Sequence, residues 1–198
     1  MGPSDKYKSL ITKLVQILCI KKYRKVAQTY VSRDYFPIDE CLEICEREGV
    51  TDACAILYKR KGQYKKSISL YVEVLTKLSD DVIIAVSVAD NIMPFNDPRI
   101  KNEHIKKFDE LLTMIIDICD NYGSRRLKDT EAEDLWIYSI EQIYVIKREV
   151  VDKNTNPAEQ EDLRNFQVFL LARIQEFMMR MAEYVSLERI INLLQEKG

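Results

Sequence analysis

Apolar residues recur every three or four positions along most of the chain. Because residues with this spacing share one face of an α-helix, each such stripe predicts an amphipathic helix. Trp136, within one stripe, is expected to be buried between adjacent helices. The clearest stripes are Ile105, Phe108, Leu112, Ile115, Cys119 and Tyr122; Trp136, Ile140, Ile143, Ile146 and Val150; and Leu163, Phe166, Leu170, Ile174, Phe177, Met181 and Tyr184.

Residues that start and stop helices flank these stripes. Prolines stand just before periodic segments, where the first turn of a helix accepts them. Thr130 with Glu133 has the spacing of a capping box. Glycines follow periodic runs, where a left-handed residue ends a helix. The prolines and glycines concerned are Pro37, Pro98, Pro157, Gly49, Gly62 and Gly123. The predicted helices span about 5–31 (with a candidate break near 20), 37–48, 51–61, 64–78, 81–91, 99–122, 130–151, 157–184 and 187–196.

The predicted connections between Pro37 and Leu78 are two or three residues long. Such short links place consecutive helices antiparallel, as hairpins. No fixed sequence period recurs, so a strict repeat is not indicated. The predicted fold class is therefore all-α, an irregular α-solenoid of antiparallel helical hairpins, forming one segment over residues 5–198. Residues 1–4, MGPS, are interpreted as a cloning remnant outside the fold.

Composition narrows the class of protein. The 198 residues are 46% hydrophobic, with only five Gly and five Pro, which disfavours a loop-rich β fold. The net charge of −2 gives no overall attraction to nucleic acid or to anionic membranes. Five cysteines without disulfide-type spacing indicate free, buried thiols in a reducing compartment. The longest apolar run, residues 82–89, is far shorter than the roughly 20 residues that span a bilayer. We expect a soluble, intracellular protein.

Three cysteines, Cys41, Cys45 and Cys54, fall within one predicted hairpin. A structural zinc site needs four ligands, usually as two spaced pairs. There is no CxxC pair, and His104, the only histidine, is distant in sequence. The pattern favours cysteines on a buried helix face, and no metal is expected.

A basic run surrounds Gly62. It could bind an anionic partner, but Glu40, Glu43, Glu46 and Glu48 precede it, which favours a solvated, partly paired surface. The run is kept as a candidate partner-binding patch. No nucleic-acid reading motif accompanies it. The residues of this basic patch are Lys59, Arg60, Lys61, Lys65 and Lys66.

Catalytic motifs are absent from the sequence. A single histidine excludes two-histidine metal schemes, and there is neither a Gly-rich phosphate loop nor a GxSxG motif. We expect no enzyme activity, no cofactor and no small-molecule substrate.

Three stretches resemble a known family. ECLEICEREGVTDACAILYKRKGQYKKSISLY, from Glu40 to Tyr71, resembles the clathrin-heavy-chain-type hairpins of vacuolar protein sorting tethering subunits. EDLWIYSIEQI, from Glu133 to Ile143, and MAEYVSLERIINLL, from Met181 to Leu194, resemble the C-terminal solenoid of the vacuolar protein sorting-associated protein 8-like subunits of the CORVET complex.

The resemblance implies a scaffold fragment of a larger vesicle-tethering subunit. Such subunits act with other subunits of the complex and with an early-endosomal Rab GTPase. The implied location is cytoplasmic and peripheral on early endosomes, with membrane contact only indirect. No GTPase- or zinc-contacting residue carries over to this chain. The alternative is a helical segment of a clathrin-like coat or adaptor protein.

Overall fold

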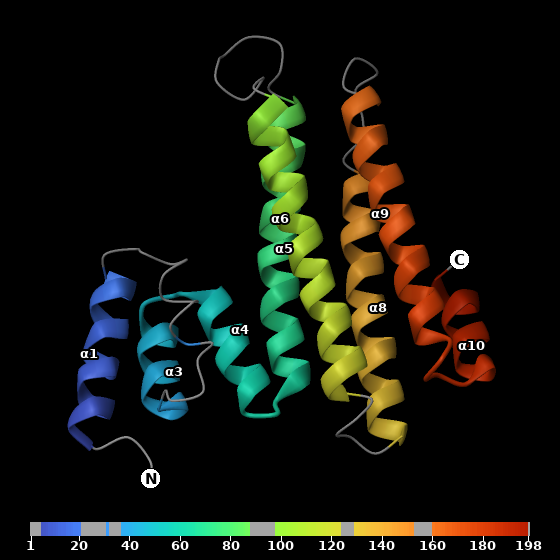
Figure 1. Ribbon diagram of the computed structural model, residues 1–198. Coiled ribbons are helices and arrows are strands. Elements are labelled where there is room, and N and C mark those ends of the chain that lie inside the picture. Colours follow the sequence, from blue (N-terminus) through green and yellow to red (C-terminus); the bar gives the residue numbers. More distant parts are fainter. Residues whose placement is uncertain are drawn as a thin grey trace. The chain divides into compact units, whose positions relative to one another are not determined.

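The computed structural model describes residues 5–20, 31, 37–87, 98–123, 129–152 and 160–197. Every element in these ranges is a helix, so the all-α class is confirmed for the described residues, which contain no strand. The solenoid arrangement stays a prediction. The helices are α1 (Asp5–Ile20), α3 (Ile38–Arg47), α4 (Thr51–Arg60), α5 (Tyr64–Ser87), α6 (Pro98–Asp117), the π-helix η1 (Ile118–Gly123), α8 (Asp129–Asp152), α9 (Gln160–Met181) and α10 (Leu187–Lys197) (Figure 1).

The chain divides into two compact units, Met1–Val74 and Leu75–Gly198. In the first unit α1 packs on α3, and α3 packs on α4. Their facing sides are fully or nearly buried and form one core. It contains Ile11, Val15, Cys19, Val31, Cys41, Leu42, Ile44, Cys45, Val50, Ala53, Cys54, Leu57 and Tyr58.

Glycine ends two helices of the first unit, as predicted. Gly49 and Gly62 have φ of 66° and 75°, in the left-handed region. Each is followed by a residue whose N–H reaches back across the last turn: Val50 N donates to Cys45 O at 2.9 Å, and Gln63 N donates to Tyr58 O at 3.0 Å. With Gly49 N on Glu46 O and Gly62 N on Lys59 O, both ends are Schellman motifs.

Two boundary predictions were wrong. The break predicted at residues 79 and 80 does not exist, because α5 runs unbroken from Tyr64 to Ser87. Ser79 is buried, and its hydroxyl donates to Thr76 O at 2.8 Å. The buried hydroxyl therefore has a hydrogen-bond acceptor within its own helix. The α-helix predicted over 99–122 is α-helical only to Asp117 and continues as η1.

The predicted capping box at Thr130 was also wrong. Helix α8 begins at Asp129, so Thr130 lies inside it. The Glu133 carboxylate contacts Ser186 and Arg189 and does not return to the start of its own helix. Pro98 begins α6 as predicted, whereas Pro37 stands one residue before α3. Pro157 and the end of the predicted 81–91 helix lie outside the described residues.

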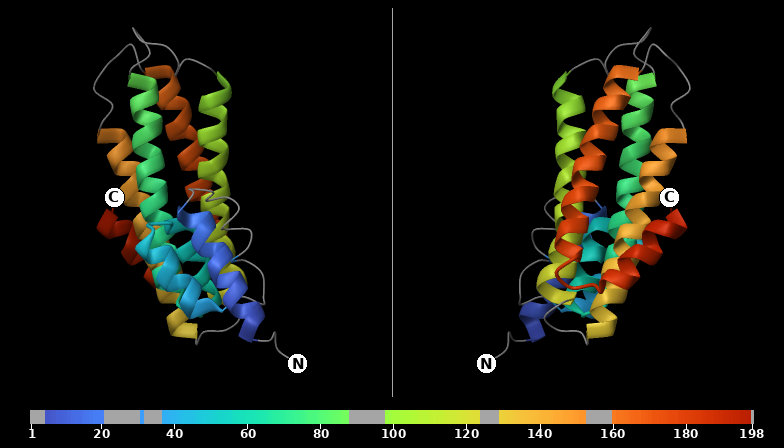
Figure 2. Two further views of the ribbon diagram at one scale, coloured as in Figure 1. Left: turned by 90° about the vertical axis from the view of Figure 1, so that its left-hand side faces the viewer. Right: turned by 90° about the vertical axis from the view of Figure 1, so that its right-hand side faces the viewer.

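The second unit is built around long helices. Helix α9 packs along α8 and contacts α6 (Figures 1 and 2). Aromatic rings fill its interior: Phe108 meets Phe166 edge-on at 5.3 Å, and Trp136 meets Phe177 edge-on at 5.0 Å between ring centroids. Trp136 is 0% exposed, which confirms its predicted burial.

Candidate interaction surfaces

Four thiols lie together in the core of the first unit. Cys19 and Cys45 face each other with their Sγ atoms 3.9 Å apart. Burial raises the pKa of Cys41 to about 11 and that of Cys54 to about 12, and it also raises the pKa of Cys19 and Cys45. Because the thiolate is the reactive and metal-binding form, protonated thiols act here as small apolar side chains.

Potential metal-ligating side chains do not form a cluster in the described part of the chain. Among the described residues, no group of three or more His, Cys, Asp and Glu side chains could hold a metal ion. The side chain of His104 lies outside the described residues. The expectation that the chain binds no metal stays a prediction, to be tested by elemental analysis of chelator-washed protein.

Much of the basic patch already has partners within the first unit. Arg60 NH1 donates to the Val31 carbonyl oxygen at 2.8 Å. Lys61 Nζ lies 2.6 Å from Asp39 Oδ1. Lys59 also takes part in an intramolecular interaction. Lys65 is exposed to solvent. Binding of an anionic partner at this patch stays a prediction, with Lys65 as one of its exposed charges.

Lys66, the last residue of the patch, belongs to a polar triad. It donates to the Tyr58 hydroxyl, which in turn donates to Glu46. Lys66 Nζ also lies 4.0 Å from the centroid of the Tyr58 ring and 3.9 Å from Glu46 Oε1. The hydrogen bond that Lys66 donates to the Tyr58 hydroxyl raises the pKa of Lys66.

This triad borders a pocket of about 180 Å³ in the first unit. The thiol-bearing residues Cys45 and Cys54 contribute to its apolar side. Glu46, Tyr58 and Lys66 are hydrogen-bonded to one another at its edge. Its lining is completed by Gly49, Val50, Thr51 and Leu70.

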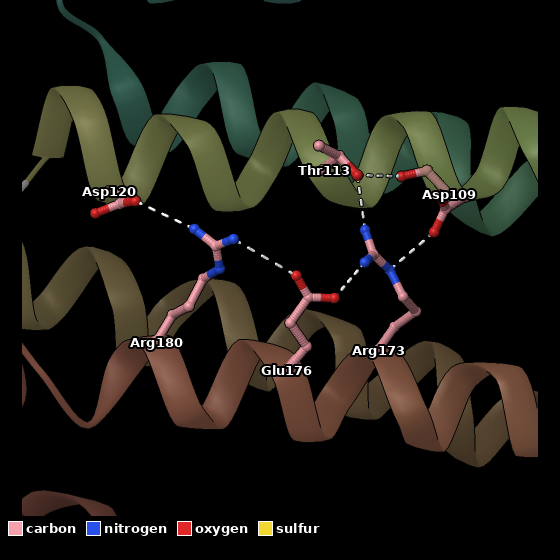
Figure 3. Close-up of polar contacts among 6 residues, drawn as sticks. All are labelled: Asp109, Thr113, Asp120, Arg173, Glu176 and Arg180. Carbon is pink, nitrogen blue, oxygen red and sulfur yellow. Dashed lines mark hydrogen bonds and ion pairs between the residues drawn. The ribbon is translucent and has the colours of Figure 1, made fainter.

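In the second unit, Arg173 links α9 to α6 (Figure 3). Its Nε lies 2.8 Å from Asp109 Oδ1, and its NH2 donates to the Thr113 hydroxyl at 2.7 Å. Its NH1 pairs with Glu176 on its own helix. The guanidinium is therefore held at three points, with a side chain that is only 18% exposed. An arginine fixed in this way acts as a structural clamp.

Two turns further along α9, Arg180 continues this row of contacts (Figure 3). Its NH1 donates to Asp120 Oδ2 at 3.3 Å, and its NH2 lies 3.7 Å from Glu176. The Tyr184 hydroxyl donates to the other oxygen of Asp120 at 2.6 Å. Asp120 lies in η1, whose wider π turn presents this carboxylate to α9.

The second and third family-like stretches meet in space. Arg189 of α10 donates to Glu133 Oε2 at 2.8 Å and to Asp134 Oδ1 at 2.5 Å, both in the first turns of α8. Trp136 stacks on Tyr184, with ring centroids 5.6 Å apart and planes 11° from parallel. These pairs could not be predicted from the sequence, because their partners lie about 50 residues apart, where helical periodicity carries no information.

Exposed apolar side chains are concentrated on the outer faces of α1, α9 and α10. On α10 they are spaced by four and three residues and form a single stripe. Such stripes on a helical array suit contact with further helices. The exposed residues are Tyr7, Leu10, Ile17 and Ile20 on α1, Val168, Leu171 and Met179 on α9, and Leu187, Ile191 and Leu194 on α10.

Comparison with known proteins returned no matching family model, no matching curated protein and no matching solved structure. Within the described residues, none of the helices combines the length and the apolar character needed to span a bilayer.

Proposed function

We propose that this chain is a structural and interaction segment of an endosomal vesicle-tethering subunit, of the vacuolar protein sorting-associated protein 8-like type found in CORVET. In this role the helices do no chemistry. They hold binding surfaces at fixed positions, as helical arrays do. The proposed location is the cytoplasmic side of early endosomes, reached through protein partners.

One observation carries the proposal. Each stretch that resembles the family lies within a packed group of helices, and two of the three stretches contact each other. Glu40–Tyr71 forms α3, α4 and the start of α5, joined by two Schellman turns. Glu133–Ile143 and Met181–Leu194 contact each other through Arg189 and Trp136. The protonated thiols and the mutually satisfied polar triad support a scaffold over a catalytic role. The resemblance itself rests on sequence, and fold alone does not assign function.

The test is an affinity purification on the immobilised 198-residue chain from an endosome-enriched extract, with identification by mass spectrometry. We expect subunits of the class C tethering core and an early-endosomal Rab GTPase. An unrelated helical protein of similar size and charge serves as the control bait. Recovery of clathrin-coat components instead would favour the coat or adaptor alternative. Recovery of neither set above the control would contradict the proposal.

A variant addresses the basic patch in the same assay. Lys65→Glu reverses an exposed charge of the patch and spares Arg60 and Lys66, which make contacts within the first unit. If an acidic partner binds there, recovery should fall at low salt and differ less at moderate salt, where charges are screened over about 8 Å. Equal recovery at both salt concentrations would remove the patch as a binding site.

A further inference from the structure

Helix α1 has a second apolar stripe, beside the one that packs in its core. Ile11, Val15 and Cys19 are the buried stripe, none of them more than 5% exposed. Tyr7, Leu10, Leu14 and Ile17 follow one another at spacings of three, four and three residues. Tyr7, Leu10 and Ile17 are 48%, 68% and 52% exposed, and Leu14 is half-buried. This spacing is the a and d pattern of a coiled-coil seam.

Charges beside this seam have one sign. Lys6 and Lys13 are exposed and stand one position before Tyr7 and Leu14, at the g positions that flank a seam. The sequence around them is basic throughout. From Lys6 to Arg33 there is no Asp or Glu, while there are eight basic residues: Lys6, Lys8, Lys13, Lys21, Lys22, Arg24, Lys25 and Arg33.

We propose that the outer face of α1 binds an amphipathic helix of a partner protein, with apolar residues at its seam and acidic residues beside the seam. The apolar spacing sets the kind of partner, because a narrow a and d stripe matches one helix. The lysines set its charge, because acidic residues at the flanking positions pair with them and basic residues repel them. This inference is independent of the endosomal assignment.

An anionic membrane is the competing occupant, and the observations favour it less. A helix that lies in a membrane interface presents a broad apolar face to the lipid. On α1 the stripe of Ile11, Val15 and Cys19 is already used by the core of the first unit. The outer stripe that remains is narrow.

The test measures binding of two designed peptides to the 198-residue chain by fluorescence anisotropy. Both peptides carry four heptads with Leu at a and d. One has Glu at e and g, and the other has Lys at these positions. We expect the acidic peptide to bind at least ~10-fold more tightly than the basic one, with a preference that weakens as salt rises.

Two variants locate the binding face. Leu10→Gln with Ile17→Gln removes two exposed seam residues and should weaken binding of the acidic peptide by ~10-fold or more. Lys6→Glu with Lys13→Glu should invert the preference, so that the basic peptide binds better. The matched control is Ile191→Gln with Leu194→Gln, which removes a similarly exposed stripe on α10 and should leave binding unchanged. Circular dichroism checks that each variant keeps its helicity.

Several outcomes would overturn the proposal. One is equal binding of the two peptides, or binding that the control variant reduces as much as the α1 variant. Another is sedimentation with vesicles of equimolar phosphatidylcholine and phosphatidylserine in the absence of peptide binding, which would assign the face to a membrane. A third is concentration-dependent self-association that Leu10→Gln with Ile17→Gln abolishes, which would assign the face to a second copy of the chain.

Discussion

Trp136 is one of the largest buried side chains of the second unit. It is fully buried, edge-on to Phe177 and stacked on Tyr184. Trp136→Ala removes both ring contacts and leaves a cavity, so the free energy of unfolding should fall by about 3–5 kcal/mol. Urea denaturation followed by circular dichroism measures this change. Val145→Ala, at an exposed position of the same helix, should change it by less than about 0.5 kcal/mol.

An unchanged denaturation midpoint for Trp136→Ala would contradict the placement of this ring. A large loss of stability from Val145→Ala would show that shortening even an exposed side chain destabilises α8. The loss in Trp136→Ala could then not be assigned to burial of the Trp136 ring.

The buried thiols predict how stability depends on alkaline pH. A thiol has an ordinary pKa of 9.0, and burial raises the pKa of Cys41 to about 11 and that of Cys54 to about 12. Above about pH 9 the unfolded chain loses protons that the folded chain keeps. The contribution of these thiols to stability is therefore complete below pH 9 and is lost progressively as the pH rises toward 11 to 12.

Urea denaturation of the first unit at pH 8, 9 and 10 measures this loss. Tyr and Lys also titrate in this range, so the comparison is with Cys41→Ala plus Cys54→Ala, which removes two of the thiols. The slope of stability against pH should be less steep in this variant. Parallel slopes for the two proteins would show that the thiols do not carry the pH dependence.

At the scale of elements, the turn at Gly62 joins α4 to α5 through a left-handed residue. Its φ of 75° costs an L-residue about 1–2 kcal/mol, so Gly62→Ala should destabilise the first unit by about that amount. The cost is conformational, because an added Cβ would have only the Tyr64 hydroxyl near it, at 4.0 Å. Gly62→Asn should cost less, since Asn tolerates this region better.

Thermal or urea denaturation of the two Gly62 variants checks the order. Ser69→Ala, at an exposed position inside α5, is the control for introducing alanine nearby. If Ala and Asn at position 62 gave equal stability, the backbone conformation would not be the cause of the loss.

At the scale of the whole molecule, each of the two compact units contains residues whose signals report on its own unfolding. Cys41, Cys45 and Cys54 report on Met1–Val74, and Trp136 reports on Leu75–Gly198. Because each unit has its own buried core, we expect their unfolding transitions not to coincide. Trp136 fluorescence and hydrogen exchange of peptides from α3 and α4, both followed through a urea series, compare the two directly.

Superimposable transitions from both probes would show one cooperative unit and contradict this expectation. The comparison also bears on α5, the helix that begins in the first unit and continues into the second. Intermediate protection of its amides would be the sign that the two units unfold separately.

Sequence alone determined the helices and several of their ends. The apolar spacing of α6, α8 and α9 follows from the helical period, which acts between residues three and four apart. The ends at Gly49 and Gly62 follow from the freedom of glycine at positive φ. Burial of Trp136 followed from its place within a stripe. The helices and their ends rest on interactions within one or two helical turns, which a sequence shows directly.

Tertiary structure alone decided which polar residues meet. Arg173 with Asp109, Arg189 with Glu133, and Lys66 with Tyr58 and Glu46 join residues from different helices, and local patterns do not encode these pairs. The same reason explains one error. Glu133 has the spacing of a capping box, but packing of the helices places Ser186 and Arg189 beside its carboxylate. The error at Ser79 is local instead, because the Ser79 hydroxyl donates to Thr76 O within the same helix, which therefore continues.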